Sequence, residues 1–464
     1  MGTIVQQQDY NIPESKKKSK HPPGLYLLFM TEMWERFSYY GMRAILVLYL
    51  TASVAAGGLG MKEQSAMLIY GFFTGAVYFM PLLGGYLSDR FLGRRLAITI
   101  GGLTMALGNL ALFAHQNHTF LYTGLALLII GNGFFKPNIS TIVGDLYSEN
   151  DPRRDAAFTI FYMGINVGAF FSPLIVGYVS EDLFAKTMNG FIQYGYKYGF
   201  LVSAIGMIIG QIIFNALGNR FLGDIGKKPT GKPKKSNKGI KQSQPLTKKD
   251  KERTAVIFIL AAFVVFFWAG FEQAGSSMTL YTQKFIDREI FGWTIPVSWF
   301  QSVNPLFIVL LAPVVSAFWM KLNKSKRGDW KIPTKMAVGM MLLGLGFFVL
   351  VLAVMKTGSD PNDIQHKANL LFIVFTYLFH TVGELFLSPV GLSVVSRIAP
   401  VKLASLLMGV WLSASGFANI LAGKLATYTD SLGYLEVFSL IGGIAILLGL
   451  VLLTLSNKLT KMMD

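Results

Sequence analysis

The sequence contains no cysteine and few charged residues. The absence of cysteine from all 464 positions excludes disulfide bonds, thiolate metal sites and cysteine nucleophiles. Charged residues make up 14% of the chain, whereas soluble domains typically carry about 25%. Hydrophobic residues account for 52%, the mean hydropathy is +0.48, and there are 48 glycines. This composition predicts a protein that crosses a membrane many times.

Apolar stretches of about 20 residues predict twelve membrane-spanning helices. They lie at 25–50, 65–87, 96–114, 120–142, 156–179, 194–220, 253–277, 298–320, 336–356, 368–392, 403–427 and 434–457. An even number of spans places both ends of the chain on one side of the membrane. Loops and adjoining span ends on that side hold 31 of the 42 Lys and Arg residues, and the other 11 lie within the spans or in the opposite loops. Since positive loops stay inside, we expect both termini in the cytoplasm of a cell-membrane protein.

The net charge of +17 therefore reports membrane topology, and no nucleic-acid partner is expected. The lysine-rich start of the chain imitates a signal peptide. The apolar run that follows is long, carries charges and lacks a small-residue cleavage site, so we interpret it as a retained first span.

The pattern of spans predicts an all-α transmembrane fold with two six-helix bundles around a central cavity. We expect a cytoplasmic tail at 1–24, an N-terminal bundle at 25–221, a basic linker at 222–252 and a C-terminal bundle at 253–464. A weak internal repeat supports two equivalent halves, as expected for two parallel six-helix repeats around a central cavity. Residues 131–143 align with 383–395 and share Gly131 with Gly383, Pro137 with Pro389, and Val143 with Val395.

The first span carries four charges inside "FMTEMWERFSYYGMRAILVLYL" at 29–50. A charge at the centre of a bilayer costs roughly 2.5–3.5 kcal/mol on insertion scales. On a helix that turns about 100° per residue, the charges share one face with Tyr39; they are Glu32, Glu35, Arg36 and Arg43. We expect this face to contact protein or a wet cavity. A static buried ion network that fixes helix packing is the alternative interpretation.

Three further charges lie within other predicted spans, at Lys136, Glu272 and Glu384. With the first span they give cations in the first half of the chain and two added carboxylates in the second. Such a cavity suits a zwitterionic ligand, whose carboxylate would meet Arg43 and Lys136 and whose ammonium would meet Glu384. It also suits a proton carrier, because a desolvated carboxylate accepts a proton more readily.

Four stretches of the sequence resemble signatures of one transporter family. "TEMWERFSYYGMR" at 31–43 is similar to an ExxER signature, and "FYMGINVGAFFSP" at 161–173 is similar to a fifth-span signature. "GGYLSDRFLGRRLAI" at 84–98 resembles a loop between spans two and three, and "PVSWFQSVNPLF" at 296–307 a stretch around span eight. The family is that of the proton-coupled oligopeptide transporters, a branch of the major facilitator superfamily. The resemblance covers nearly the whole chain.

The resemblance implies a proton-coupled symporter that imports di- and tripeptides by alternating access. It implies a monomer in the lipid bilayer that needs no metal and no cofactor beyond the proton gradient. Many bacterial members insert two extra helices between the halves, but here only a polar linker of about 30 residues stands there. We therefore expect twelve spans and not fourteen.

The resemblance also implies roles for individual residues. Proton coupling is expected at Glu32, Glu35, Arg36 and Glu272. Arg43 is expected to pair with Glu272 on the extracellular side of the cavity. Lys136 and Glu384 are expected to contact opposite ends of the peptide and to pair with each other when no peptide is bound. The remaining substrate-binding positions are Tyr39, Tyr40, Tyr78, Asn166, Trp268, Asn304, Ser388 and Trp411.

Several of these residues have a plainer alternative role. Trp268 and Trp411 also suit helix packing or anchoring at the membrane interface. His380 lies one turn before Glu384, and we expect it to pack or to line the cavity, with proton transfer left to carboxylates. The loop residues Asp89, Arg90, Arg94 and Arg95 are expected to bridge helix ends and bias the inward and outward states. Simple positive-inside anchoring is the alternative for this loop.

Three other functions remain open at the level of sequence. A related facilitator that carries nitrate, a drug or a sugar would share the architecture. A membrane receptor would bind peptide without transporting it. An enzyme within the membrane is not expected, because the sequence shows no His/Glu metal spacing, no Ser-His pair in a motif and no nucleotide-binding loop.

Overall fold

The computed structural model describes residues 20–148, 151–188, 190–229, 231, 246–325, 328–358, 364, 366–400 and 402–463. Most of the expected N-terminal tail, residues 1–19, lies outside the described residues. So do residues 230 and 232–245 of the expected linker.

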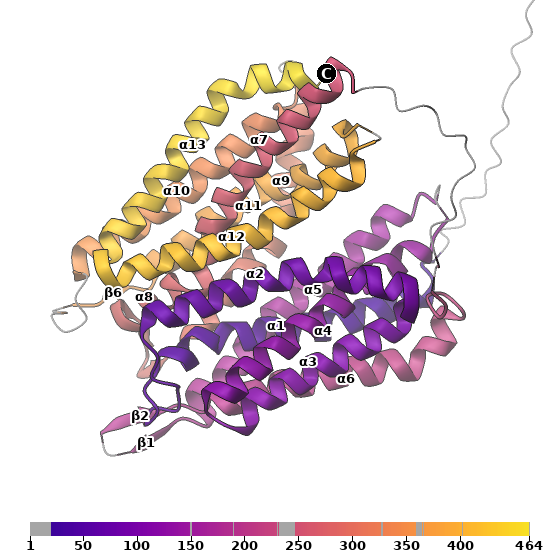
Figure 1. The fold of residues 1–464 in the computed structure, drawn as a ribbon. Helices are drawn as coiled ribbons and strands as arrows, with labels where there is room; N and C mark the ends of the chain where they lie inside the picture. Colours follow the sequence, from indigo (N-terminus) through magenta and orange to yellow (C-terminus); the bar gives the residue numbers. More distant parts are fainter. Residues whose placement is uncertain are drawn as a thin grey trace, which may run out of the picture.

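Six long helices form the N-terminal half (Figure 1). They are α1 (Pro23–Thr51), α2 (Glu63–Leu87), α3 (Arg94–Ala114), α4 (His118–Asp145), α5 (Arg154–Gly177) and α6 (Tyr196–Leu222). Two π-helical segments, η1 (Ser88–Leu92) and η2 (Tyr178–Leu183), extend α2 and α5. Pro23 begins α1, where its missing N–H leaves no helical bond unmade. The Asn117 side chain caps α4 by accepting a hydrogen bond from the Phe120 N–H.

The C-terminal half begins with a span that is interrupted in its middle. Helix α7 (Lys248–Phe271) passes through the 3₁₀ segment η3 (Glu272–Gly275) into α8 (Ser277–Phe285). A capping box between Thr247 and Asp250 starts α7. The remaining elements are η4 (Val297–Ser302), α9 (Val303–Asn323), α10 (Ile332–Thr357), α11 (Leu371–Ile398), α12 (Ala404–Leu432) and α13 (Tyr434–Met463).

Among the described residues, short strands occur only in the connections between helices. β1 (Lys186–Met188) pairs antiparallel with β2 (Phe191–Gln193), and β4 (Glu289–Ile290) with β5 (Trp293–Thr294). β3 (Ile286–Asp287) pairs in parallel with β6 (Ala368–Asn369). The body of the protein is helical, as predicted.

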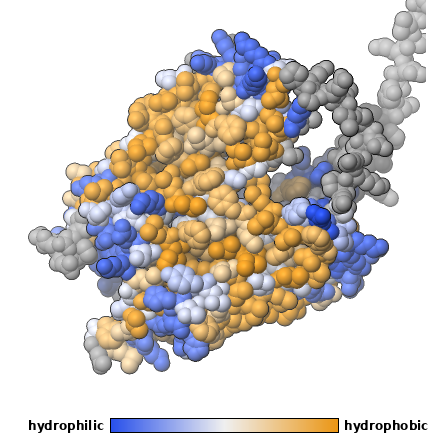
Figure 2. Space-filling model, in the orientation of Figure 1, coloured by the Kyte–Doolittle hydropathy of each residue, from blue (hydrophilic) through white to orange (hydrophobic). Residues whose placement is uncertain are grey.

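The helices correspond one to one with the predicted spans when α7, η3 and α8 count as a single interrupted span. Within the described part of the chain, eleven spans are long and apolar enough to cross a membrane. Helix α1 has 29 residues but stands apart because of its four charged residues. Figure 2 shows the matching surface, with apolar residues over the flanks of both halves and polar residues toward the ends.

Each half has its own hydrophobic core. Buried residues of α1 to α6 form one cluster, joined by a few side chains of the second half such as Leu280 and Ala426. A second cluster contains only residues from Val256 onward. In Figure 1 the two halves appear as bundles set side by side, with α2 along α12. Separate cores allow the bundles to move as bodies.

The two ends of the bundles differ in how the halves meet. We call the end with Lys20 and Met463 the terminal end, and the end with the strands the far end (right and left in Figure 1). Toward the far end, α2 and α12 touch through glycine. A Cβ at Gly71 would lie 2.6 Å from the Cα of Gly423, so neither position has room for a side chain.

Candidate functional site

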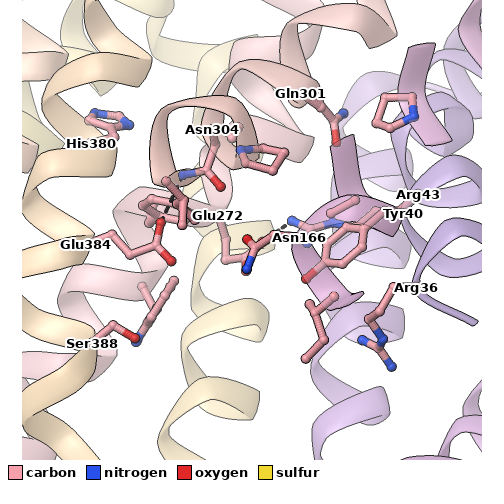
Figure 3. A pocket seen from close by; sticks show the side chains of 18 of the residues that line it. Arg36, Tyr40, Arg43, Asn166, Glu272, Gln301, Asn304, His380, Glu384 and Ser388 are labelled. Atoms are coloured by element: carbon pink, nitrogen blue, oxygen red, sulfur yellow. Dashed lines mark hydrogen bonds and ion pairs between the residues drawn. The ribbon is translucent and has the colours of Figure 1, made fainter. Parts of the chain in front are cut away.

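A cavity of about 270 Å³ lies between the two bundles (Figure 3). Its walls come from α1, α2, α4 and α5 on one side and from α7, η3, η4, α9 and α11 on the other. Eleven of the predicted site residues line it: Arg36, Tyr40, Arg43, Tyr78, Lys136, Asn166, Trp268, Glu272, Asn304, Glu384 and Ser388. Their roles remain predictions, but the structure brings them together around one space.

The N-terminal wall of the cavity carries three cations, Arg36, Arg43 and Lys136. The Lys136 ammonium lies 4.8 Å from the centre of the Tyr78 ring, which is within range of a cation–π interaction. Arg36 Nε lies 3.2 Å from a Glu32 oxygen, and Arg36 Nη2 donates to Glu35 Oε1 at 2.7 Å. The side chains of this wall that face the cavity are therefore positive, and the carboxylates behind Arg36 neutralise part of that charge.

The carboxylates of the ExxER stretch lie behind Arg36 and do not line the cavity. Glu35 is fully buried and also accepts a hydrogen bond from Asn132 Nδ2 at 3.2 Å. Glu32 is 2% exposed, and its Oε2 has no hydrogen-bond partner among the described residues. An uncompensated buried carboxylate oxygen is costly while charged, so Glu32 is suited to accept a proton.

The C-terminal wall carries the carboxylates Glu272 and Glu384. Glu272 stands at η3, where the span is interrupted, and pairs with Arg43 across the two bundles (Figure 3). The expected pair between these two residues is thus formed. Arg43 Nε also donates to the Tyr70 hydroxyl at 2.6 Å, which anchors the guanidinium in its own bundle.

Glu384 bonds within its own bundle. Asn304 Nδ2 donates to Glu384 Oε2 at 2.9 Å and lies 3.0 Å from the Thr381 hydroxyl oxygen. Between the described side chains of Lys136 and Glu384 no ion pair occurs, so the pairing implied by the family resemblance is not formed in this conformation. Both groups line the cavity from opposite walls.

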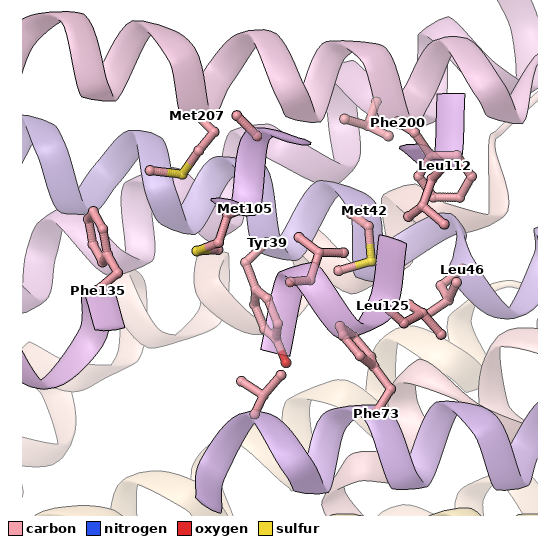
Figure 4. Packing of buried hydrophobic residues seen from close by; sticks show 14 of the residues in the cluster. Tyr39, Met42, Leu46, Phe73, Met105, Leu112, Leu125, Phe135, Phe200 and Met207 are labelled. Atoms are coloured by element: carbon pink, nitrogen blue, oxygen red, sulfur yellow. The ribbon is translucent and has the colours of Figure 1, made fainter. Parts of the chain in front are cut away.

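The placement of Tyr39 corrects the prediction that it lines the pocket. Tyr39 is 4% exposed and packs in the N-terminal core beside Phe73 (Figure 4). With Glu32 set at 0° and about 100° per residue, Arg43, Arg36 and Tyr40 lie near +20°, +40° and +80°. Glu35 and Tyr39 lie near −60° and −20°. The polar face of α1 is therefore divided, and only its positive-angle half meets the cavity.

Trp411 also departs from its predicted place in the pocket. It is 7% exposed and belongs to the core of the C-terminal bundle, which matches the packing alternative. Trp268 does line the cavity and contacts Phe271 edge to face, with ring centres 5.1 Å apart. The position of a tryptophan along its span could not tell whether the ring lines the cavity or packs in the core, because each bundle has both a cavity face and a core face.

His380 lines the cavity and packs at the same time, as expected. Its ring centre lies 4.9 Å from that of Phe347, and its Nε2 has no hydrogen-bond partner among the described residues. A Cβ on Gly346 would collide with the imidazole, so the ring fills a space that only glycine leaves open.

The loop arginines bridge neighbouring helices of the N-terminal bundle at the terminal end. Arg94 bonds to Asp89 at 3.2 Å and to Asp145 at the end of α4 at 2.5 Å. Arg95 donates to Asn219 of α6 at 3.0 Å and to the Gly223 carbonyl at 2.9 Å. Arg90 contacts Tyr86 within its own helical segment. These contacts match the bridging that was expected, whereas a gating role stays a prediction.

Several cavity residues were missed by sequence reasoning. They are Tyr162, Ile165, Ala169, Pro173, Phe271, Ala274, Gln301, Pro305, Ile308 and Tyr377. Helical spacing could have found some of them, since Tyr162 and Ala169 flank Asn166 at intervals of four and three residues. Tyr377 precedes Glu384 by two turns. Gln301 had no such signal, because its place depends on how η4 docks against the other bundle.

No group of three or more residues able to hold a metal ion occurs among the described side chains. The site's chemistry is that of ionised and hydrogen-bonding groups around a space that admits a small molecule. Comparison with known proteins then identifies the family.

Residues 95–240 and 232–437 match the family model described as PTR2, POT family. The chain belongs to the POT family. It is 33% identical to the peptide transporter YePEPT of Yersinia enterocolitica over 92% of this chain and 91% of that one. It is 32% identical to a di-/tripeptide transporter of Lactococcus lactis subsp. cremoris, over 95% and 96% respectively. An uncharacterized transporter of Bacillus subtilis, YclF, is 35% identical over 96% and 95%.

Solved POT structures have the same fold. A mutant of the peptide transporter POT in complex with alafosfalin is 33% identical and matches 96% of both chains with a TM-score of 0.85. A POT family transporter in complex with 5-aminolevulinic acid is 31% identical and covers 95% of this chain and 97% of its own, with a TM-score of 0.84. These similarities confirm the predicted transporter fold and the assignment as a transporter and not an enzyme.

Proposed function

We propose that this POT family member is a symporter that imports di- and tripeptides together with protons by alternating access. The observation that carries the proposal is the division of charge across the cavity, with Lys136, Arg36 and Arg43 on one wall and Glu384 and Glu272 on the other. A peptide is a zwitterion whose two ends differ in charge. The peptide carboxylate binds near Lys136, and its ammonium binds near Glu384.

Two further features of the cavity suit peptides with varied side chains. Tyr40, Tyr78 and Trp268 give the cavity aromatic walls that accept varied side chains. Asn166, Asn304 and Ser388 supply neutral hydrogen-bonding groups that suit a peptide backbone. Two similar transporters are named for di- and tripeptides or for peptides, which agrees with this assignment.

The proposed proton site is the group formed by Glu32, Glu35 and Arg36, together with Glu272. Protonation of Glu32 or Glu35 loosens the hold on Arg36, whose guanidinium lines the cavity. Protonation of Glu272 weakens the bridge to Arg43 and so releases one bundle from the other. Protonation of the first-span group thus changes the binding wall, and protonation of Glu272 changes the contact between the bundles.

The driving force is sufficient for strong accumulation. At a membrane potential of about 100 mV, one transferred charge is worth roughly 2.3 kcal/mol. Since a tenfold concentration ratio costs roughly 1.36 kcal/mol, one proton sustains roughly 50-fold accumulation of a neutral peptide. The proton gradient adds to this value, so no other cofactor is needed.

The proposed orientation places the terminal end, both termini and the linker in the cytoplasm of a cell-membrane protein, since that side carries most of the Lys and Arg. The working unit is a monomer with bundles at 25–221 and 253–464, joined by 222–252. Asp89, Arg90, Arg94 and Arg95 act as a gate at this cytoplasmic side. In the present conformation, Arg94 bonds to Asp145 of α4 and Arg95 bonds to Asn219 of α6.

The test is uptake of labelled dialanine into liposomes that contain the purified protein. Acid outside should drive uptake, and unlabelled di- and tripeptides should compete where tetrapeptides, free alanine, nitrate and sugars do not. Glu35→Gln should abolish acid-driven uptake but retain peptide exchange without a gradient. Lys136→Ala should lower both by at least tenfold, because it removes a contact with the peptide.

Matched controls separate these effects from a general loss of charge. Lys197 and Glu289 are exposed and do not line the cavity, so Lys197→Ala and Glu289→Gln should transport normally. Undiminished driven uptake by both Glu35→Gln and Lys136→Ala contradicts the proposal. Competition by nitrate or a sugar in place of peptides indicates a different substrate. Binding without exchange indicates a receptor.

A further inference from the structure

A second cavity, of about 540 Å³, lies at the terminal end of the C-terminal bundle. It is framed by the starts of α7 and α10 and the ends of α11 and α13, and is separate from the cavity between the bundles. Nothing in the transport mechanism above uses it. Among the described residues, its walls carry Arg253, Lys331, Lys335 and Arg397 and one carboxylate, Asp329.

The charges in this cavity are compensated only in part. Lys335 pairs with Asp329 at 2.6 Å. Lys331 Nζ donates to the neutral Asn457 Oδ1 at 2.6 Å. Within the described part of the chain, no carboxylate lies within 4 Å of the Lys331 or Arg397 side chain. Cations gathered in this way repel one another unless an anion binds between them.

The surroundings of the cavity indicate the depth of lipid headgroups. Trp330 lines it and lies 5.7 Å from the Trp319 ring, over which the Lys335 ammonium sits at 4.2 Å. The Phe318 ring of α9 lies 6.1 Å from that of Trp330, and Phe318 and Val314 are both exposed. Tryptophan and lysine at helix ends next to an apolar flank are typical of a membrane–water interface.

We propose that this cavity binds the phosphate group of an anionic phospholipid. Guanidinium and ammonium groups are the usual donors to phosphate oxygens, and Arg397 offers the planar geometry that suits them. Basic pockets between membrane helices on the cytoplasmic side take anionic headgroups in this manner. A free phosphate would meet the same donors, but the aromatic rim and the exposed flank of α9 favour a lipid. The proposal does not depend on which substrate the transporter carries.

The test is binding of a short-chain phosphatidylglycerol to the purified full-length protein in detergent, followed by native mass spectrometry. Phosphatidylglycerol should remain bound at concentrations where phosphatidylcholine with the same chains does not. The double variant Lys331→Gln/Arg397→Gln should weaken binding at least tenfold. The variant Lys331→Arg/Arg397→Lys keeps both charges and should retain binding, and unchanged dialanine exchange by the Gln variant excludes misfolding as the cause.

Lys321→Gln/Lys324→Gln is the matched control, because these exposed lysines at the end of α9 lie outside the cavity. Its binding should equal that of the unmodified protein. Equal binding of phosphatidylcholine, or no loss in Lys331→Gln/Arg397→Gln, overturns the proposal. Binding of inorganic phosphate at the same concentration, with displacement of the lipid, supports the phosphate site but rejects the lipid as its occupant.

Discussion

At the far end of the molecule, side chains of one bundle bond to the other, whereas at the terminal end the described bonds of Arg94, Arg95 and Lys331 stay within their own bundle. Toward the far end, Glu181 accepts hydrogen bonds from the Val297 and Ser298 N–H groups at 2.7 and 3.1 Å. Trp293 donates to Asp182 at 2.7 Å, and Lys284 pairs with Glu63.

The charges at the terminal end form a different pattern. Arg94 and Arg95 hold α3 to α4 and α6, and Lys331 holds α10 to α13, each inside one bundle. The cavity between the bundles is therefore sealed mainly from the far end. Under the proposed orientation this is an inward-facing conformation, and import requires that the contacts of the two ends exchange.

The largest effect is expected from forcing the far end apart with a side chain. Gly423→Leu places a branched group where the backbone of Gly71 stands, so α2 and α12 cannot close. We expect dialanine exchange to fall at least tenfold in liposomes. Gly443→Leu is the control, because a Cβ there meets nothing within 4 Å. Normal exchange by Gly423→Leu would show that this close approach is not required for transport.

A smaller but still strong effect is expected from Glu272→Gln. It removes the charge that meets Arg43 across the bundles, and breaking a buried pair costs about 3–5 kcal/mol. The bond from Arg43 to Tyr70 and the wet cavity reduce this cost. The far end should open in a larger fraction of molecules, seen as longer distances between spin labels there. Unaltered distances together with full acid-driven uptake would show that Glu272 neither holds the far end closed nor takes part in proton coupling.

Glu181→Ala should have a local effect. It leaves two backbone N–H groups of η4 without their acceptor, and hydrogen bonds to a charged group contribute about 1.5–3 kcal/mol each. Amide hydrogen exchange in residues 297–302 should speed up roughly tenfold or more, while α10 keeps its protection. Glu181→Gln should have a milder effect, since it keeps one acceptor. Equal protection in all three proteins would mean that Glu181 does not hold η4.

The smallest effect is expected from Lys284→Gln. The side chains of Lys284 and Glu63 are 25% and 26% exposed, so solvent screens their attraction. A double-mutant cycle with Glu63→Gln should give a coupling of about 1 kcal/mol or less, and added salt should reduce it. A coupling as large as that of the Arg43–Glu272 pair would contradict the ranking of the far-end contacts by burial.

Sequence periodicity predicted the fold well because a membrane helix must be long and apolar, and this signal is local. It also found the charged residues of the cavity, since isolated charges within spans require a wet or paired environment. Periodicity could not show which part of the polar face of α1 meets the cavity. Tyr39 was therefore predicted to line the cavity, although it lies in the core. Nor could periodicity find Gln301 or Glu181, whose contacts exist only because η4 meets the other bundle.

The central claim, that the two ends exchange their contacts around one peptide site, can be measured directly. The chain has no native cysteine, so spin labels can be attached at introduced cysteines alone. Val54→Cys with Phe291→Cys reports on the far end, and Arg220→Cys with Lys461→Cys on the terminal end; all four positions are exposed. With dialanine at acid pH, the account predicts that far-end distances lengthen while terminal-end distances shorten in the same sample. Distances that stay fixed at both ends, or lengthen at both, in protein that still transports dialanine would contradict it.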